Sequence, residues 1–293
     1  MKKLIKSLSL LFTIILLFSS FTFKPVSLKI SPDDYPRVDG STATIPLAIN
    51  LRSAVTGESV EDLQLTTIHS TTTDSFRALA NNQSDLLLVY TPNNSVLQEL
   101  KDKGVDIIMT PIGRDALVFF TNEKNKVSNL TTKQIQNIYA GNIINWKQVG
   151  GKNSTILPYQ RDAESGSQVL MEKLVMGDVN MMTPTKDYLV TSMLGIVETV
   201  ASYKNTNNAL GYSVYYYIKA FLNDNYKIKL LKANGVMPSN KTIKNGTYPF
   251  CENFYAVIRA DEPENSETRK LFNFITSDEG KKLIEDSGYV ALN

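Results

Sequence analysis

The sequence predicts an α/β fold in which a middle domain is inserted into a discontinuous outer domain. The chain has 293 residues, which is more than one average domain needs. Short apolar runs typical of strands alternate with segments of helical patterning, which favours α/β units around mainly parallel sheets. Two polar stretches, at 123–129 and 234–248, interrupt this alternation next to apolar strands. We therefore expect the chain to cross twice between the two domains.

The predicted elements follow a polar lead-in at 29–40. Strands are expected where aliphatic and aromatic residues cluster in short runs. They lie at 63–68, 86–89, 107–111, 117–121, 156–159, 211–215, 228–231 and 254–258. Helices are expected where apolar residues recur three or four positions apart. They lie at 45–54, 74–81, 95–103, 132–140, 167–176, 193–201, 217–223, 266–277 and 279–287.

The first thirty residues have the pattern of an export signal. Residues 1–7 are basic, and residues 8–18 form an apolar run interrupted only by Ser9 and Thr13. This run is too short for a comfortable membrane span, and no cysteine near residue 20 offers a lipid anchor. We expect segment 1–30 either to be cleaved or to stay as an N-terminal anchor. The mature protein is then extracytoplasmic: secreted, periplasmic or at the cell surface.

Charge and composition exclude several classes of function. The formal net charge is +2, and Lys2, Lys3 and Lys6 lie in the export signal, so the rest of the chain is close to neutral. A neutral body lacks the basic surface of a general nucleic-acid binder. One cysteine, Cys251, and one histidine, His69, exclude an intrachain disulfide and a zinc cluster. No cofactor is expected.

Three predicted helix starts carry residues suited to binding an anion. They are Asp39-Gly40-Ser41-Thr42-Ala43, Ser70-Thr71-Thr72-Thr73 and Arg161-Asp162-Ala163-Glu164-Ser165-Gly166-Ser167-Gln168. A helix N-terminus has free N–H groups and a partial positive charge. Hydroxyl groups add donors, and arginine adds a charged fork that matches tetrahedral oxyanions. Serine and threonine are also ordinary helix caps, so only the three starts together favour an anion-binding cleft.

Several segments resemble one protein family in the same order along the chain. They lie at 39–43, 111–122, 132–151, 159–168, 211–217, 243–257 and 277–291. The most specific are IYAGNIINWKQVGG at 138–151 and RDAESGSQ at 161–168. Over residues 36–293 the chain is similar to the phosphate-binding (PstS-like) proteins of bacterial phosphate ABC transporters.

This resemblance implies a bilobal type 2 periplasmic-binding-protein fold that closes on one phosphate ion. Lobe 1 would comprise 31–117 and 253–293, and lobe 2 would comprise 118–252. The crossing strands would lie at 115–122 and 253–259. The implied function is capture of inorganic phosphate and its delivery to a membrane ABC permease by a monomeric, non-catalytic protein.

The resemblance also implies which residues hold the phosphate. These are Ser41, Thr42, Ala43, Ser70, Thr71, Arg161, Ser165, Gly166 and Ser167. Two positions depart from the family pattern. Tyr90 stands where better-studied members have an aspartate that accepts a hydrogen bond from protonated phosphate, and Ala163 stands where they have an acid that pairs with the arginine. The alternative is a surface binding or sensing module for another oxyanion or a small acidic ligand. A hydrolase using Ser41, Ser165 or Ser167 lacks a second histidine, a metal cluster or a nucleophile elbow.

Overall fold

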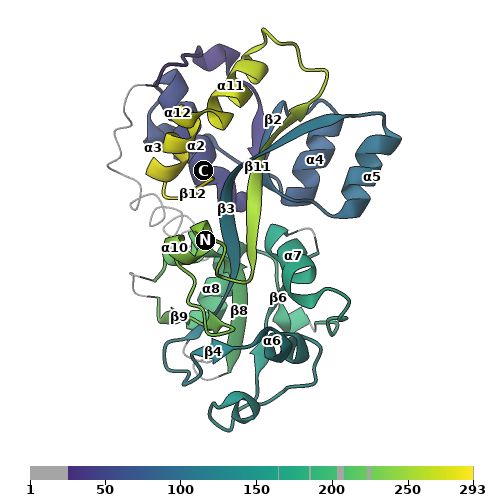
Figure 1. Ribbon diagram of the computed structural model, residues 1–293, viewed down its shortest axis with the longest axis vertical. Helices are drawn as coiled ribbons and strands as arrows, with labels where there is room; N and C mark the ends of the chain where they lie inside the picture. The colour runs from purple at the N-terminus through teal and green to yellow at the C-terminus, as the bar shows by residue number, and fades with distance from the viewer. Residues whose placement is uncertain (1–25, 164, 185, 203–207, 223–225, 293) are drawn as a thin grey trace, which may run out of the picture.

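A computed structural model of the protein describes residues 26–163, 165–184, 186–202, 208–222 and 226–292. The export signal predicted at 1–30 lies mostly outside this part. Two halves are stacked along the long axis, and strands β3 (Ile107–Asn122) and β11 (Cys251–Arg259) run between them (Figure 1). We call the elements before β3 and after β11 the upper half, and those between them the lower half.

The upper half consists of three further strands and six α-helices in the described residues. They are β1 (Val38–Gly40), β2 (Leu86–Tyr90), β12 (Val290–Ala291), α2 (Ile45–Thr56), α3 (Val60–Thr66), α4 (Thr72–Ala80), α5 (Asn94–Asp102), α11 (Glu267–Thr276) and α12 (Asp278–Asp286). Helices α4 and α5 lie on one side of the upper sheet, with α2, α11 and α12 on the other (Figure 1). Because helices cover both sides of the sheet, both faces of β2 are shielded from solvent, and all five of its residues are buried.

The lower half contains shorter elements. Its strands are β4 (Asn129–Leu130), β5 (Leu157–Pro158), β6 (Gln160–Arg161), β7 (Leu189–Val190), β8 (Ala209–Val214), β9 (Ile228–Leu230) and β10 (Lys232–Ala233). Its α-helices are α6 (Thr132–Tyr139), α7 (Gly166–Leu170), α8 (Met193–Ala201), α9 (Tyr215–Lys219) and α10 (Asn240–Lys244). Helix α7 continues directly into a π-helical turn, Met171–Met176.

The main sheet is mixed, so the expectation of mainly parallel sheets was wrong. Its strand order is β1-β2-β11-β3-β8-β5, and β9 and β12 also pair with β3. Strand β3 runs antiparallel to β11, β8, β9 and β12, whereas β1 with β2 and β5 with β8 are parallel. The β3–β11 pair is antiparallel because these two strands carry the chain between the halves in opposite directions.

Strand β3 is continuous where the sequence predicted two strands. Residues 107–116 pair with β11, and residues 117–121 pair with β8. The apparent break falls at Pro111, where the register shifts between Phe254 and Tyr255 of β11. A bulge tolerates proline because a ladder hydrogen bond is already missing there.

The strand predicted at 63–68 is instead the helix α3. Ser59 caps this helix by accepting a hydrogen bond from the Asp62 amide at 3.1 Å. Leu63 is buried, but Leu65 and Ile68 are 66% and 81% exposed. The alternating leucines therefore reflect one buried contact and not a half-buried strand.

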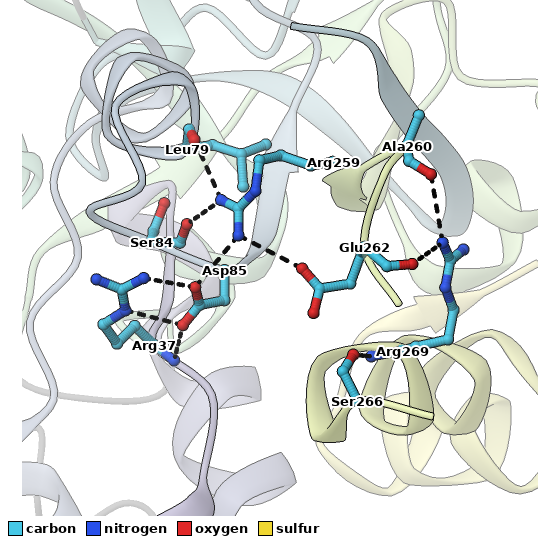
Figure 2. Close-up of polar contacts among 9 residues, drawn as sticks. All are labelled: Arg37, Leu79, Ser84, Asp85, Arg259, Ala260, Glu262, Ser266 and Arg269. Atoms are coloured by element: carbon cyan, nitrogen blue, oxygen red, sulfur yellow. Dashed lines mark hydrogen bonds and ion pairs between the residues drawn. The ribbon is translucent and has the colours of Figure 1, made fainter. Parts of the chain in front are cut away.

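A polar network fixes the ends of three strands of the upper sheet (Figure 2). Asp85 precedes β2 and contacts Arg37, which precedes β1, at 2.6 Å. It also contacts Arg259, the last residue of β11, at 3.4 Å. Arg259 donates to the Ser84 carbonyl at 2.8 Å and contacts Glu262 at 3.4 Å. One carboxylate thus joins β1, β2 and β11 at the end of the sheet remote from the lower half.

Candidate functional site

A cavity of about 70 Å³ lies where the two halves meet. Both halves contribute to it: its upper wall comes from two helix starts and the end of β2, and its lower wall from α7, the ends of β6 and β8, and the chain entering α8. The lining residues are Ser41, Thr42, Ala43, Thr71, Thr72, Tyr90, Arg161, Asp162, Ser165, Gly166, Ser167, Thr191, Met193 and Val214.

The first helix start is held against β2 by a close approach of the two backbones. A Cβ on Gly40 would lie 1.9 Å from the Leu88 carbonyl oxygen, so only glycine fits there. The Ser41 amide donates to that same carbonyl at 3.2 Å. The chain then turns through Thr42–Thr44 into α2. Thr42 and Ala43 are therefore the residues whose amides begin a helix at the cavity.

The second helix start presents Thr72 to the cavity where Ser70 was expected. The amide and the hydroxyl of Ser70 both donate to the Asp39 carboxylate at 2.8 Å, and Ser70 does not line the cavity. Thr71 lines it and caps α4 by accepting from the Asp74 amide at 3.2 Å. Thr72 is buried, and its hydroxyl lies 2.8 Å from that of Ser41. The helix begins two residues before the predicted start, which brings Thr72 to the cavity.

Arg161 is buried at the cavity, and hydrogen bonds to backbone carbonyls orient its guanidinium group. Its Nε donates to the Val190 carbonyl at 2.9 Å, and its Nη2 to the Thr191 carbonyl at 3.0 Å. Its Nη1 donates to the Ser167 hydroxyl at 3.3 Å. Burial lowers the pKa of Arg161, although a guanidinium stays charged. Two of its five N–H groups therefore donate to no residue in the described part of the chain.

The start of α7 completes the lower wall. Ser165 occupies the N-cap position without capping through its side chain, and its hydroxyl lies 3.0 Å from that of Ser167. Gly166 approaches the upper half closely, since a Cβ there would lie 2.4 Å from the Thr72 hydroxyl oxygen. The second and third helix starts therefore face each other across the cavity.

Tyr90 and Ala163, the two residues that depart from the family pattern, lie in different places: Tyr90 lines the cavity and Ala163 does not. Tyr90 lines the cavity, but its hydroxyl donates to the buried Asp115 carboxylate at 2.8 Å. Ala163 is exposed, and its neighbour Asp162 is the acidic residue among the described residues that line the cavity. Glu164 lies outside the described residues. The strand that carries Tyr90, β2, was predicted from the sequence. The short strand β6, which carries Arg161, was not, and neither were the partners Asp115, Val190 and Thr191.

The arrangement suits a small oxyanion. It combines amides of helix starts, hydroxyl groups and one buried arginine. Pockets for organic ligands typically measure about 300–1,000 Å³, so this cavity accommodates an inorganic ion more readily than a phosphorylated metabolite. Within the described ranges, no three His, Cys, Asp or Glu side chains form a group able to hold a metal ion. Nor does that part of the chain contain a helix with the length and hydrophobicity to span a membrane.

Comparisons with known proteins identify similar chains. The phosphate-binding protein PstS of Borreliella burgdorferi is 27% identical over 62% of this chain and 65% of its own length. PstS of Staphylococcus saprophyticus is 25% identical over 87% of this chain and 79% of its own. With several such relatives, the chain spans less than two thirds of the relative's length.

Solved structures share the fold. An ABC-type phosphate transport receptor from Vibrio cholerae superposes with a TM-score of 0.64 at 24% identity, covering 87% of this chain and 99% of the receptor. PstS from Borrelia burgdorferi gives 0.55 at 22% identity, covering 87% and 98%. These likenesses confirm the predicted bilobal fold. A family model described as the PBP superfamily domain matches residues 30–279, and the chain belongs to that superfamily.

Proposed function

We propose that this protein captures inorganic phosphate between its two halves and delivers it to a membrane ABC permease. The observation that carries the proposal is the small cavity in which three helix starts and the buried Arg161 converge from both halves. The relatives named phosphate-binding proteins support the choice of anion. An anion that contacts both walls stabilises the closed arrangement over an open one, which is hinge closure.

The proposal extends to the organisation of the chain. Lobe 1 comprises 31–117 and 253–293, and lobe 2 comprises 118–252. The protein works outside the cytoplasm as a monomer and without catalysis. Its phosphate ligands are Ser41, Thr42, Ala43, Thr71, Arg161, Ser165, Gly166 and Ser167, together with Thr72 from the second helix start. Ser70 acts through Asp39, which orders the turn between β1 and the cavity.

A second candidate is the same closure on a different oxyanion. Tyr90 favours it, because its hydroxyl is already donated to Asp115 and the upper wall offers no carboxylate among the lining residues. A carboxylate acceptor distinguishes protonated phosphate from sulfate, since an unpaired donor on a buried ligand costs about 1–3 kcal/mol. Asp162, on the lower wall, supplies the acceptor that the phosphate proposal needs.

Calorimetric titration of phosphate-free protein tests both candidates. We expect one phosphate per chain, with sulfate binding much more weakly. Arg161→Ala should weaken binding about a hundredfold or more, because it removes a buried, hydrogen-bonded charge. Arg77→Ala, which changes an arginine paired with Glu99 outside the cavity, is the control and should bind as the unsubstituted protein does. Equal binding of sulfate would favour the second candidate, and unchanged affinity in Arg161→Ala would refute the site.

A further inference from the structure

Asp115 is a buried carboxylate at the point where β3 passes from one half to the other. It pairs with Glu252 of β11, and two residues later Leu117 pairs with Val214 of β8. Asp115 is only 2% exposed. Burying a carboxylate costs folding free energy unless the group is hydrogen-bonded. The hydrogen bonds of Asp115 therefore show how the fold accommodates it.

Those contacts reach two segments that line the anion cavity. Asp115 Oδ2 accepts from the Tyr90 hydroxyl at 2.8 Å, and Tyr90 lines the upper wall. Asp115 Oδ1 accepts from the Tyr216 amide at 3.2 Å, two residues after the cavity-lining Val214. It also accepts from the Ala116 amide at 2.7 Å. The carboxylate is thus hydrogen-bonded to a residue that lines the cavity and to the backbone two residues beyond another.

The other ionisable groups around Asp115 do not neutralise it by direct contact. From α9, Tyr215 and Tyr216 face it, and Lys219 attracts it from a distance while donating to the Gly288 carbonyl. Tyr289 precedes β12 and is stacked on Tyr216. Burial raises the pKa of Tyr289 and the charge of Asp115 adds to the rise, so this phenol stays neutral.

Strand β11 adds two more groups. Cys251 has its pKa raised to about 11, mainly by burial, and so stays a neutral thiol. Glu252 lies opposite Asp115, but its carboxylate is paired with Lys173 at 2.6 Å. Among the described residues no cation forms an ion pair with Asp115. Its negative charge is therefore stabilised by hydrogen bonds and by the more distant charge of Lys219.

The protonation state of Asp115 is therefore finely balanced. Burial raises the pKa of Asp115 to about 6, against the opposing effects of the Ala116, Tyr90 and Tyr216 hydrogen bonds and of Lys219. Near neutral pH the side chain is mostly an anion, yet a small additional unfavourable charge is enough to protonate it. A phosphate ion in the adjacent cavity is such a charge, since like charges disfavour the ionised form.

We infer that capture of the anion is coupled to the uptake of a proton by Asp115. The proton comes from the solvent and resides on the carboxyl group, which then donates to the Tyr90 hydroxyl oxygen. The coupling is reciprocal: whatever factor the bound anion adds to proton affinity, the proton adds to anion affinity. This inference rests on the proposed phosphate capture. It makes Asp115 a positioning residue whose charge opposes binding, and Asp115→Asn a variant that binds phosphate more tightly at high pH.

Calorimetry across the pH range tests the inference. Asp115→Asn should bind phosphate about tenfold more tightly than the unsubstituted protein at pH 8, the equivalent of one pKa unit. The two affinities should converge at pH 5, where Asp115 is already protonated. Titrations in buffers of different ionisation enthalpy should show fewer protons taken up by Asp115→Asn near pH 6–7. Phosphate contributes its own protons equally in both proteins, so the difference isolates Asp115.

Two further variants make the result decisive. Tyr90→Phe removes a hydrogen bond to the ionised form, so the pH at which affinity changes should rise. Asp102→Asn, on the exposed surface of α5, should keep the unsubstituted profile. Weaker binding of Asp115→Asn at every pH, or equal proton uptake, would overturn the inference and leave phosphate capture standing. If Asp115→Asn does not fold, an unshifted profile in Tyr90→Phe overturns it. Absence of binding in the unsubstituted protein would refute the proposed function, and the inference with it.

Discussion

Gly166 brings the lower half to within a side chain's width of the upper half. Its position would place a Cβ 2.4 Å from the Thr72 hydroxyl oxygen, far inside van der Waals contact. Gly166→Ala should therefore weaken phosphate binding about tenfold or more, because the walls can then meet only if Thr72 moves. The fold should be retained, since alanine suits the first turn of a helix. Calorimetry and thermal melting measure the two effects.

The same clash predicts a non-additive pair. Thr72→Ala removes the hydroxyl that the new Cβ would meet, so adding Gly166→Ala to Thr72→Ala should cost little further affinity. A double-mutant cycle measures this coupling, and contacting residues typically show 0.5–3 kcal/mol of it. Full additivity, or undiminished binding by Gly166→Ala alone, would contradict a cavity closed by these two helix starts.

At the level of elements, Asp85 holds β1, β2 and β11 together through Arg37 and Arg259. Burial by itself would raise the pKa of Asp85, but the hydrogen bonds and charge of Arg37, with a bond from Arg259, outweigh it and lower that pKa. The stability gained from the ionised form is therefore present above the unfolded value near 3.9. It is lost as pH falls through the lower folded pKa. Asp85→Asn should thus cost about 1–3 kcal/mol at pH 7.

Urea unfolding at pH 7 and at pH 3 measures the effect, and the difference between the two proteins should narrow at the lower pH. Asp278→Asn is the matched control, because Asp278 pairs with Lys281 in full contact with solvent. Its unfolding should be almost unchanged. If Asp85→Asn lowered the free energy of unfolding equally at both pH values, the packing of the side chain, and not its charge, would be what stabilises the three strands.

Elements were predictable from sequence where one local signal determined them. The helix starts at Ser41, Thr71 and Ser165 carry short polar residues ahead of apolar periodicity, and the structure begins helical turns at all three. The helix α3 was missed because two of its leucines mimic strand alternation. The site's long-range partners were not readable either: Asp115 meets Tyr90 from 25 positions away, and Arg161 is aimed by carbonyls about 30 residues on. Such contacts depend on the fold and not on any local pattern.

Across the described residues, the larger of two apolar clusters extends through both halves, and the smaller one lies in the upper half between α4, α5 and the sheet. The larger cluster includes Leu47 of α2 and Ile284 of α12 in the upper half. It continues through Phe119 of β3 to Ile138 of α6 and Val197 of α8 in the lower half. A core that is continuous through the crossing strands couples the stability of both halves. We therefore expect them to unfold together in one cooperative transition.

Phosphate should raise the stability of that single transition as a whole. At a free concentration one hundred times Kd, a ligand specific for the native state adds about 2.7 kcal/mol. Trp146, the only tryptophan in the sequence, is buried in the lower half, so its fluorescence reports on that half, whereas circular dichroism reports on both. The two urea curves should coincide and shift together when phosphate is added, and Arg161→Ala should abolish the shift. If the fluorescence curve separated from the dichroism curve, the halves would unfold independently, and the ligand would be stabilising one lobe instead of joining two.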